Sequence, residues 1–200
     1  MLVELTIKNL LKKKDKKISL LELGVGSGCL IISILLSLKK NKVSALGVDI
    51  SKKALETADK NLKKFNLEKK LKLKKSDWFS DIHEKFDIII SNPPYIKTPD
   101  IKKLDKEVKF YDPLIALNGG FSGLRCFERI ATDAKFYLKQ DGIILLEIGF
   151  GQIKSVEKIF EKMGYKIFLK EKDLQGIIRV VGFKLKNTLK VKAKVLNSNI

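Results

Sequence analysis

The sequence is poor in several residue types, and each shortage argues against a class of protein. It has two cysteines, Cys29 and Cys126, and one histidine, His83. These are too few for a disulfide scaffold or a four-ligand zinc site, and they argue against a Cys-His protease. No metal site is therefore expected. The chain also lacks a long uncharged apolar run and a signal peptide, so we expect a cytoplasmic protein that does not span a membrane.

Arginine is rare as well, although the chain is strongly basic. There are 41 Lys and Arg residues against 23 Asp and Glu, a formal net charge of +18, and only Arg125, Arg129 and Arg179 are arginines. A basic balance can indicate a nucleic-acid partner, because clustered cations displace counterions from phosphates. The lysines instead form short groups scattered along the chain, as at 12–14 and 63–64. This pattern favours compositional drift towards lysine, and nucleic acid is not the expected substrate.

The chain has 200 residues and 44% hydrophobic content, enough to bury the core of one domain. Short apolar runs alternate with segments of helical spacing. Strands are expected at 18–23, 43–48, 71–73, 86–90, 143–148, 165–169 and 179–185, and helices at 1–13, 29–38, 51–65, 124–138 and 156–163.

This alternation predicts an α/β sandwich with a mostly parallel, seven-stranded sheet that binds ligands at the carboxyl ends of its strands. Only residues 171–178 separate the last two strands, too few for a helical crossover. We therefore expect an antiparallel hairpin at one edge of the sheet. Residues 186–200 are polar and Lys-rich and suggest a loose tail, which leaves a domain of residues 1–185.

A glycine loop follows the first expected strand. Residues 22–28 read ELGVGSG, and Cys29 stands where a dinucleotide-binding G-x-G-x-x-G loop has its third glycine. Such a loop lets the backbone approach a ligand, although a tight strand-to-helix turn needs the same residues. Glu22 would repel a pyrophosphate but accept a ligand with ammonium and sulfonium groups, which favours S-adenosylmethionine over NAD. The glycines expected to bind this cofactor are Gly24, Gly26 and Gly28.

Two further acidic positions follow the second and third strands. Asp49 ends the second strand, where a carboxylate can accept hydrogen bonds from both hydroxyls of a ribose. The alternative is an acid that stabilises the start of the next helix. After the third strand, Asp77 could accept from an adenine amino group and Trp78 could stack on the base. The alternatives there are a surface acid and a core aromatic.

The string Ser91-Asn92-Pro93-Pro94-Tyr95 follows the fourth expected strand and is the most specific motif in the chain. Two prolines make a rigid segment whose carbonyls stay free to accept hydrogen bonds. Asn92 adds an amide, and Tyr95 adds a flat amphipathic surface. Together they suit a planar nitrogen that carries two hydrogens, either an amide or an exocyclic base amine. A strand-ending turn is the structural alternative.

Taken together, these motifs resemble the release-factor glutamine methyltransferases of the PrmC/HemK family. The supporting strings are ELGVGSG, Asp49, SDWFS at 76–80 and SNPPYI at 91–96. Weaker support comes from Glu107-Val108, Asp112-Pro113, Gly119-Gly120, Gly123-Leu124, LLEIG with Gln152, and Asp173 with Arg179-Val180-Val181. The likeness spans about residues 2–185. NPPY alone also occurs in amino-methyltransferases that act on adenine of DNA or RNA.

The resemblance implies a Rossmann-like class I methyltransferase fold and methylation of the glutamine amide nitrogen in the Gly-Gly-Gln motif of peptide chain release factors. It implies that Glu22 and the glycine loop bind the methionine part of S-adenosylmethionine, Asp49 the ribose, and Asp77 and Trp78 the adenine. The implied substrate clamp consists of Asn92, Pro93, Pro94 and Tyr95, with Asn92 also near the cofactor.

Two features depart from the family pattern. Family members carry an N-terminal helical domain and an R-P-x-T-E motif before this region, whereas this sequence starts at Met1. Asp112 stands where the family more often has Glu. Two alternatives therefore remain beside glutamine methylation. One is an adenine amino-methyltransferase acting on DNA or RNA, and the other is a non-catalytic remnant that binds the cofactor.

Overall fold

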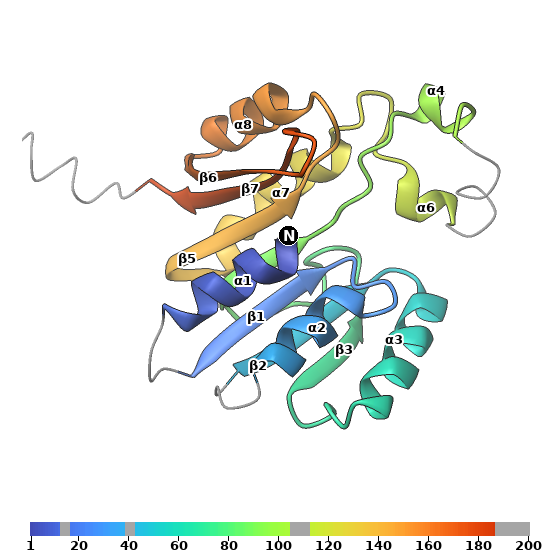
Figure 1. The fold of residues 1–200 in the computed structure, drawn as a ribbon, viewed down its shortest axis with the longest axis vertical. Helices are drawn as coiled ribbons and strands as arrows, with labels where there is room; N and C mark the ends of the chain where they lie inside the picture. Colours follow the sequence, from blue (N-terminus) through green and yellow to red (C-terminus); the bar gives the residue numbers. More distant parts are fainter. Residues whose placement is uncertain (13–16, 39–42, 105–112, 187–200) are drawn as a thin grey trace, which may run out of the picture.

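The computed structural model describes residues 1–12, 17–38, 43–104 and 113–186. A seven-stranded sheet forms the middle layer, with helices on both faces (Figure 1). The strands are β1 (Ile18–Leu23), β2 (Val43–Asp49), β3 (Leu71–Lys75), β4 (Phe86–Ser91), β5 (Leu138–Glu147), β6 (Tyr165–Lys172) and β7 (Ile178–Leu185). The helices are α1 (Leu2–Leu11), α2 (Cys29–Ser37), α3 (Lys52–Lys64), α4 (Thr98–Ile101), α6 (Leu114–Leu117), α7 (Arg125–Tyr137) and α8 (Ile153–Lys162).

The strand order is β3-β2-β1-β4-β5-β7-β6. The first five strands in that order are parallel, while β7 runs antiparallel to both β5 and β6. The prediction of a mostly parallel sheet with an antiparallel edge hairpin is confirmed. In the register of the central strands, Leu23 lies between Val48 and Ser91. The carboxyl ends of β1, β2 and β4 therefore meet at one edge of the sheet.

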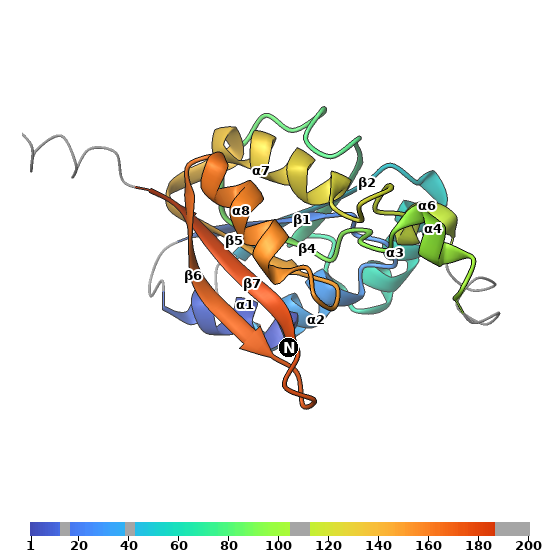
Figure 2. The same cartoon turned by 90° about the horizontal axis from the view of Figure 1, so that it is seen from above.

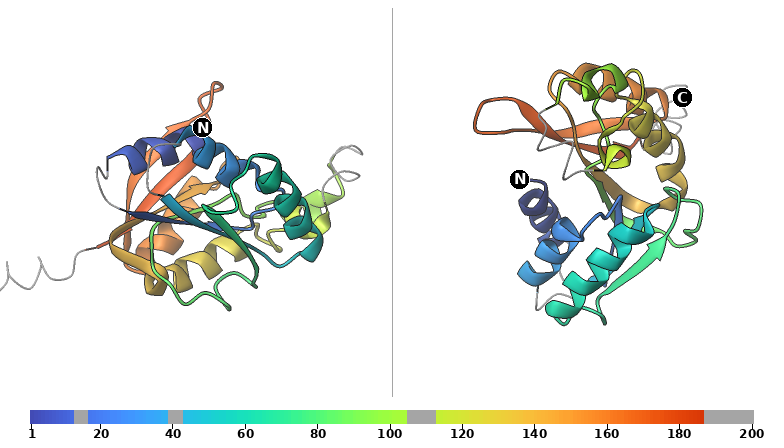
Figure 3. Two further views of the ribbon diagram at one scale, coloured as in Figure 1. Left: turned by 90° about the horizontal axis from the view of Figure 1, so that it is seen from below. Right: turned by 90° about the vertical axis from the view of Figure 1, so that its right-hand side faces the viewer.

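Alternating side chains of the central strands supply two separate cores. Leu20, Ile88 and Ile90 pack with residues of α1, α2 and α3 on one face. Leu21 and Ile89 pack with α7 and α8 on the other face. Figures 2 and 3 show these two helical layers on opposite sides of the sheet. Both faces of the inner strands are buried, which explains their continuous apolar sequences.

The structure differs from the sequence prediction mainly at β5. This strand begins at Leu138, directly after α7, rather than at residue 143. Phe86 pairs with Leu138 and Ile88 with Ile143, so an irregularity at 139–142 interrupts the ladder. Asp141 has a φ of 61° there. The sequence did not predict a strand at residues 139–142, because the bulge there breaks the alternation of apolar and polar residues that marks a strand.

Two further expectations concern the C-terminal tail and membrane-spanning helices. Residues 187–200 of the predicted tail lie outside the described residues, and the domain limit at 185 stays a prediction. Among the described helices, none is both long and apolar enough to cross a membrane.

Candidate functional site

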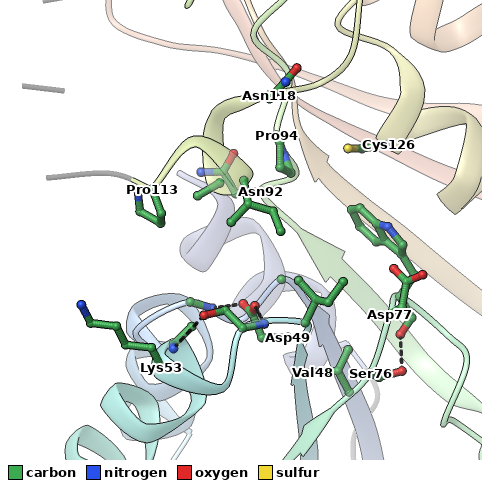
Figure 4. A pocket seen from close by; sticks show the side chains of 18 of the residues that line it. Val48, Asp49, Lys53, Ser76, Asp77, Asn92, Pro94, Pro113, Asn118 and Cys126 are labelled. Atoms are coloured by element: carbon green, nitrogen blue, oxygen red, sulfur yellow. Dashed lines mark hydrogen bonds between the residues drawn. The ribbon is translucent and has the colours of Figure 1, made fainter. Parts of the chain in front are cut away.

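A cleft of about 970 Å³ opens at the carboxyl ends of β1, β2, β3 and β4. It brings together seven of the eleven residues predicted for the site: Gly24, Gly26, Asp49, Asp77, Trp78, Asn92 and Pro94. In Figure 4, Asp49 lies on one side of the cleft, facing Asn92, Pro94 and Pro113, with Asp77 and Cys126 at one end. Residues widely separated in sequence therefore share one site.

The glycine loop turns its backbone towards this cleft. Gly24 and Gly26 have φ values of 68° and 55°, and a Cβ added at either would meet nothing within 4 Å. Open space therefore lies next to the backbone, as a bound ligand requires. Gly28 has another role, because it is the N-cap of α2 and a Cβ there would lie 3.0 Å from Ile32 Cδ1. It permits close packing and does not line the cleft.

Glu22 lies beneath the loop, with 1% of its surface exposed, and it is not among the residues that line the cleft. Its Oε2 accepts a hydrogen bond of 3.1 Å from the backbone N–H of Ile31, in the first turn of α2. The N-cap Gly28 has no side chain to satisfy this turn, so Glu22 does so from the neighbouring strand. Burial raises the pKa of Glu22 well above its ordinary value, the Ile31 bond opposes this, and the charge of Asp49 raises it further.

Asp49 joins the loop to the start of α3. Its Oδ2 accepts from the backbone N–H of Gly26 at 2.9 Å, and its Oδ1 accepts from that of Ser51 at 2.8 Å. Ser51 is in turn the N-cap of α3 and accepts from Ala54. Both interpretations of Asp49 thus have a structural basis. Each carboxylate oxygen has further lone-pair capacity, so a ribose hydroxyl can still be accepted.

Asp77 and Trp78 sit on a tight turn after β3. Ser76 Oγ donates to the carbonyl of Trp78 at 3.0 Å and accepts from the N–H of Asp81 at 3.1 Å. Trp78 has a φ of 55°, an unusual conformation for a bulky residue, and these bonds help hold it. Its ring is half-buried against the core while it also lines the cleft.

The opposite wall comes from residues that sequence reasoning missed. They share a position on α6, at the start of α7 or on the loop between, and they are Leu114, Ile115, Ala116, Asn118, Arg125, Cys126 and Arg129. Lys53 of α3 also lines the cleft. The sequence signals near this wall were Pro113, Leu124 and the glycines at 119, 120 and 123. They mark a sharp change of chain direction but not which face of α7 meets the cleft.

The Ser91–Tyr95 segment separates the cleft from a second cavity. Ser91 Oγ donates to the carbonyl of Leu23 at 2.8 Å and fixes the end of β4 to the end of β1. The second cavity, about 310 Å³, is lined by Asn92, Pro93, Pro94, Tyr95, Ile96, Ala116 and Leu117. Asn92 and Pro94 line both spaces. The Asn92 side chain is exposed and makes no hydrogen bond within the described part of the chain, so its amide is free to bind a ligand.

Gln152 supports this segment from behind. Its Nε2 donates to the carbonyls of Tyr95 at 3.0 Å and Gly123 at 3.1 Å, and its Oε1 accepts from the N–H of Gly149 at 2.9 Å. The packing is tight, since a Cβ at Gly123 would lie 2.6 Å from the Tyr95 carbonyl oxygen. Burial and, to a smaller extent, the charge of Glu147 raise the pKa of Tyr95, while Arg179 lowers it. Tyr95 is thereby kept as a neutral phenol.

Comparison with known proteins identifies the family. Residues 3–108 match the family model described as the methyltransferase small domain, which is more than half of the chain. The chain belongs to the methyltransferase small domain family. Its architecture is the class I, Rossmann-like methyltransferase fold. The magnesium protoporphyrin IX methyltransferase of Synechocystis PCC 6803, solved with bound SAM, shares this fold with a TM-score of 0.62 and 12% identity, over 92% of this chain and 78% of that one.

Two curated relatives of this family member are more similar in sequence. A protein named release factor glutamine methyltransferase from Agrobacterium fabrum is 41% identical over 165 residues, which is 82% of this chain and 56% of that protein. A protein named bifunctional methyltransferase from Rickettsia felis is 42% identical over 172 residues, 86% of this chain and 32% of that protein. The chain thus spans about a third to about half of the lengths of these relatives.

Three residues quoted for the family resemblance cannot be placed. Glu107, Val108 and Asp112 lie outside the described residues. The structure does describe the other residues quoted for the resemblance. Gly119, Gly123 and Gln152 contact the backbone of the Tyr95 segment and support it. Asp173 and Arg179 instead form an ion pair of 3.1 Å at the tip of the β6–β7 hairpin.

Proposed function

We propose that this methyltransferase domain transfers a methyl group from S-adenosylmethionine to the side-chain amide nitrogen of the glutamine in the Gly-Gly-Gln motif of peptide chain release factors. The main support is the position of Asn92, whose unbonded amide lines both the large cleft and the smaller cavity. A methyl donor bound in the large cleft and a substrate amide bound in the smaller cavity would meet at the Asn92 side chain. The name of the Agrobacterium relative supports the choice of substrate.

The residues of the cleft fit S-adenosylmethionine. The open backbone at Gly24 and Gly26 leaves room for the methionine part, with the carboxylate of Asp49 nearby to favour a positively charged group. Asp49 would accept hydrogen bonds from the ribose, and Asp77 and Trp78 would receive the adenine. Gly28 would act by allowing α2 to pack closely, and Glu22 by accepting the hydrogen bond from Ile31 that fixes the first turn of α2 beneath the loop. When bound, the sulfonium group supplies an electrophilic methyl.

The substrate clamp would consist of Asn92, Pro93, Pro94 and Tyr95. The Asn92 Oδ1 and the Pro93 carbonyl would accept the two amide hydrogens of the target glutamine, and Tyr95 would cover its flat face. A C–N bond then forms as the C–S bond breaks, and the nitrogen releases one proton to solvent, which leaves N-methylglutamine and S-adenosylhomocysteine. Orientation and acceptors that strengthen in the transition state would supply the rate, and no metal is required.

Methyl transfer with an isotope-labelled methyl donor tests the proposal. The chain is incubated with release factor, the label is located by peptide mapping, and a release factor whose Gly-Gly-Gln glutamine is replaced serves as the control. Label on that glutamine is the expected result. Label on adenine of added DNA or RNA would establish the amino-methyltransferase alternative. Cofactor binding seen as a change in Trp78 fluorescence, without transfer while an active control enzyme works, would establish the non-catalytic alternative.

A further inference from the structure

The lysines are less evenly distributed than their scattered groups suggest. Ten of the 24 residues from 52 to 75 are lysines, whereas the other 176 residues contain 28. The same segment has three acidic residues, Glu56, Asp59 and Glu68, so it carries a net charge of +7 out of the +18 of the whole chain. Uniform drift towards lysine would place about five lysines in a segment of this length. Drift therefore does not explain this concentration.

The fold places these lysines at one edge of the sheet. Helix α3 and strand β3 lie side by side, and β3 is one of the two edge strands (Figure 1). Leu71 and Leu73 of β3 pack with α3 residues, so Lys72 and Lys74 lie on the opposite face of the strand. We define the α3–β3 surface by the exposed lysines of this segment that lie on the α3 side of β3, outside the cleft, and for which no ion pair is found among the described residues. They are Lys60, Lys64, Lys69 and Lys75. None of them lines the large cleft, so the surface is separate from the candidate site.

Local structural needs account for only part of this charge. Lysines protect the open edge of β3 against pairing with other strands, and basic residues stabilise the carboxyl end of α3. Neither need requires four exposed lysines without an ion pair among the described residues on the α3 side of this edge, where like charges repel one another. Within the segment, Lys63 pairs with Asp59 at 2.6 Å and Lys52 with Glu56 at 3.9 Å. A bound polyanion would relieve the repulsion of the remaining charges.

The apolar residue on this surface indicates which polyanion fits. Phe65 ends α3 next to Lys64 and is 44% exposed, the only large apolar side chain of residues 52–75 with such exposure. One phenyl ring is too little apolar area to anchor a membrane-binding face. A single aromatic among lysines is instead typical of sites that stack one unpaired base while cations contact the backbone.

We propose that the α3–β3 surface binds single-stranded RNA, with its lysines on the phosphates and Phe65 stacked on an unpaired base. The RNA is a partner here and not the methyl acceptor. This inference does not rest on the proposed glutamine methylation. It is argued from the lysines of the α3–β3 surface and Phe65, none of which belongs to the candidate site.

Fluorescence anisotropy with a labelled oligouridylate of about 12 nucleotides tests the proposal on the intact chain. One variant changes the four lysines of the α3–β3 surface to Gln. The matched control changes four exposed lysines of α8 and β6 to Gln and has the same net charge: Lys154, Lys158, Lys162 and Lys166. Thermal unfolding of both variants establishes that they fold.

The surface variant should bind RNA at least tenfold more weakly than the unmodified chain at about 100 mM salt, and the control should stay within about threefold. The slope of log affinity against log salt should lose about 2.8, since each phosphate contact on a single strand contributes about 0.7. Phe65→Ser should weaken binding about fivefold or more with the slope unchanged.

Three results would overturn the proposal. The first is equal weakening of RNA binding in the surface variant and the control, because net charge alone would then account for the binding. The second is no RNA binding by the unmodified chain at about 100 mM salt. The third is tighter binding, through the same lysines, to vesicles of phosphatidylserine and phosphatidylcholine than to RNA. Release-factor methylation by the surface variant is measured separately, and its presence or absence does not bear on the result.

Discussion

The hydrogen bonds of Gln152 lead to a prediction about catalysis at a residue that does not line the site. Its Nε2 fixes the carbonyls of Tyr95 and Gly123, and its Oε1 fixes the N–H of Gly149. Gln152→Met keeps the length of the side chain but removes all three bonds. At roughly 0.5–1.5 kcal/mol for each neutral hydrogen bond, the free energy of unfolding should fall by about 1.5–4.5 kcal/mol. Because the side chain is only half-buried, water can replace part of this loss.

The effect on catalysis should exceed the effect on cofactor binding. Release of the Tyr95 carbonyl would loosen the proposed substrate clamp, and a misplacement of about 1 Å can cost on the order of 100-fold in rate. We expect kcat to fall about 10- to 100-fold while the Kd for S-adenosylmethionine stays within about twofold. Steady-state kinetics with release factor and a fluorescence titration of Trp78 measure the two quantities.

Gln152→Glu provides a control with almost the same shape. It keeps an acceptor for Gly149 but turns a carboxylate oxygen towards two carbonyls. Protonation returns one donor, so its kcat should recover relative to the unmodified enzyme as the pH is lowered. The reasoning would be refuted if Gln152→Met lost stability as calculated but kept normal kcat, because Gln152 would then hold the loops without positioning the clamp.

Three other predictions concern two residues of the cleft and the buried acid beneath its glycine loop. Asp49→Ala should weaken S-adenosylmethionine binding by ~1.5–3 kcal/mol for each charge-assisted bond lost, measured by Trp78 fluorescence, whereas unchanged binding would mean that the carboxylate only joins the loop to α3. Asn92→Ala should lower kcat with little change in Tm or cofactor Kd, because its side chain makes no hydrogen bond to any of the described residues. A large loss of cofactor affinity would contradict a role in the substrate clamp. Burial raises the pKa of Glu22 above its ordinary 4.5, so the unfolded chain loses this proton first and stability falls as pH rises from about 4.5 through the raised pKa. The Tm of Glu22→Gln relative to the unmodified chain should therefore increase with pH across that window, and parallel Tm curves would show that Glu22 titrates normally.

Much of the fold could be predicted because its inner strands are short and apolar throughout. The glycine loop, Asp49 and Asn92 could also be assigned to one edge of the sheet, since parallel strands place their carboxyl ends together. The early start of β5 could not be predicted, because the bulge at 139–142 replaces the alternation that marks a strand.

The parts of the site that escaped prediction depend on tertiary packing. Glu22 looked like a ligand-facing acid, but only the folded structure reveals that it is buried and accepts a hydrogen bond from the Ile31 N–H of α2. Gln152 contacts the carbonyl of Tyr95, 57 residues away, and no spacing rule relates such positions. Arg125 and Cys126 fit an ordinary helix pattern, and the rotation of α7 about its axis decides that they meet the cleft.

The position of β7 has a consequence for the order of folding. It is the last strand in the described chain, yet it lies between β5 and β6. Strand β6 therefore cannot join the sheet until residues 178–185 are present, and β5 keeps an open edge until then. During synthesis on the ribosome, both unpaired edges would be exposed to other chains. A nascent chain arrested before residue 178 should therefore be sensitive to protease and prone to aggregate, even though β1 to β5 are already complete.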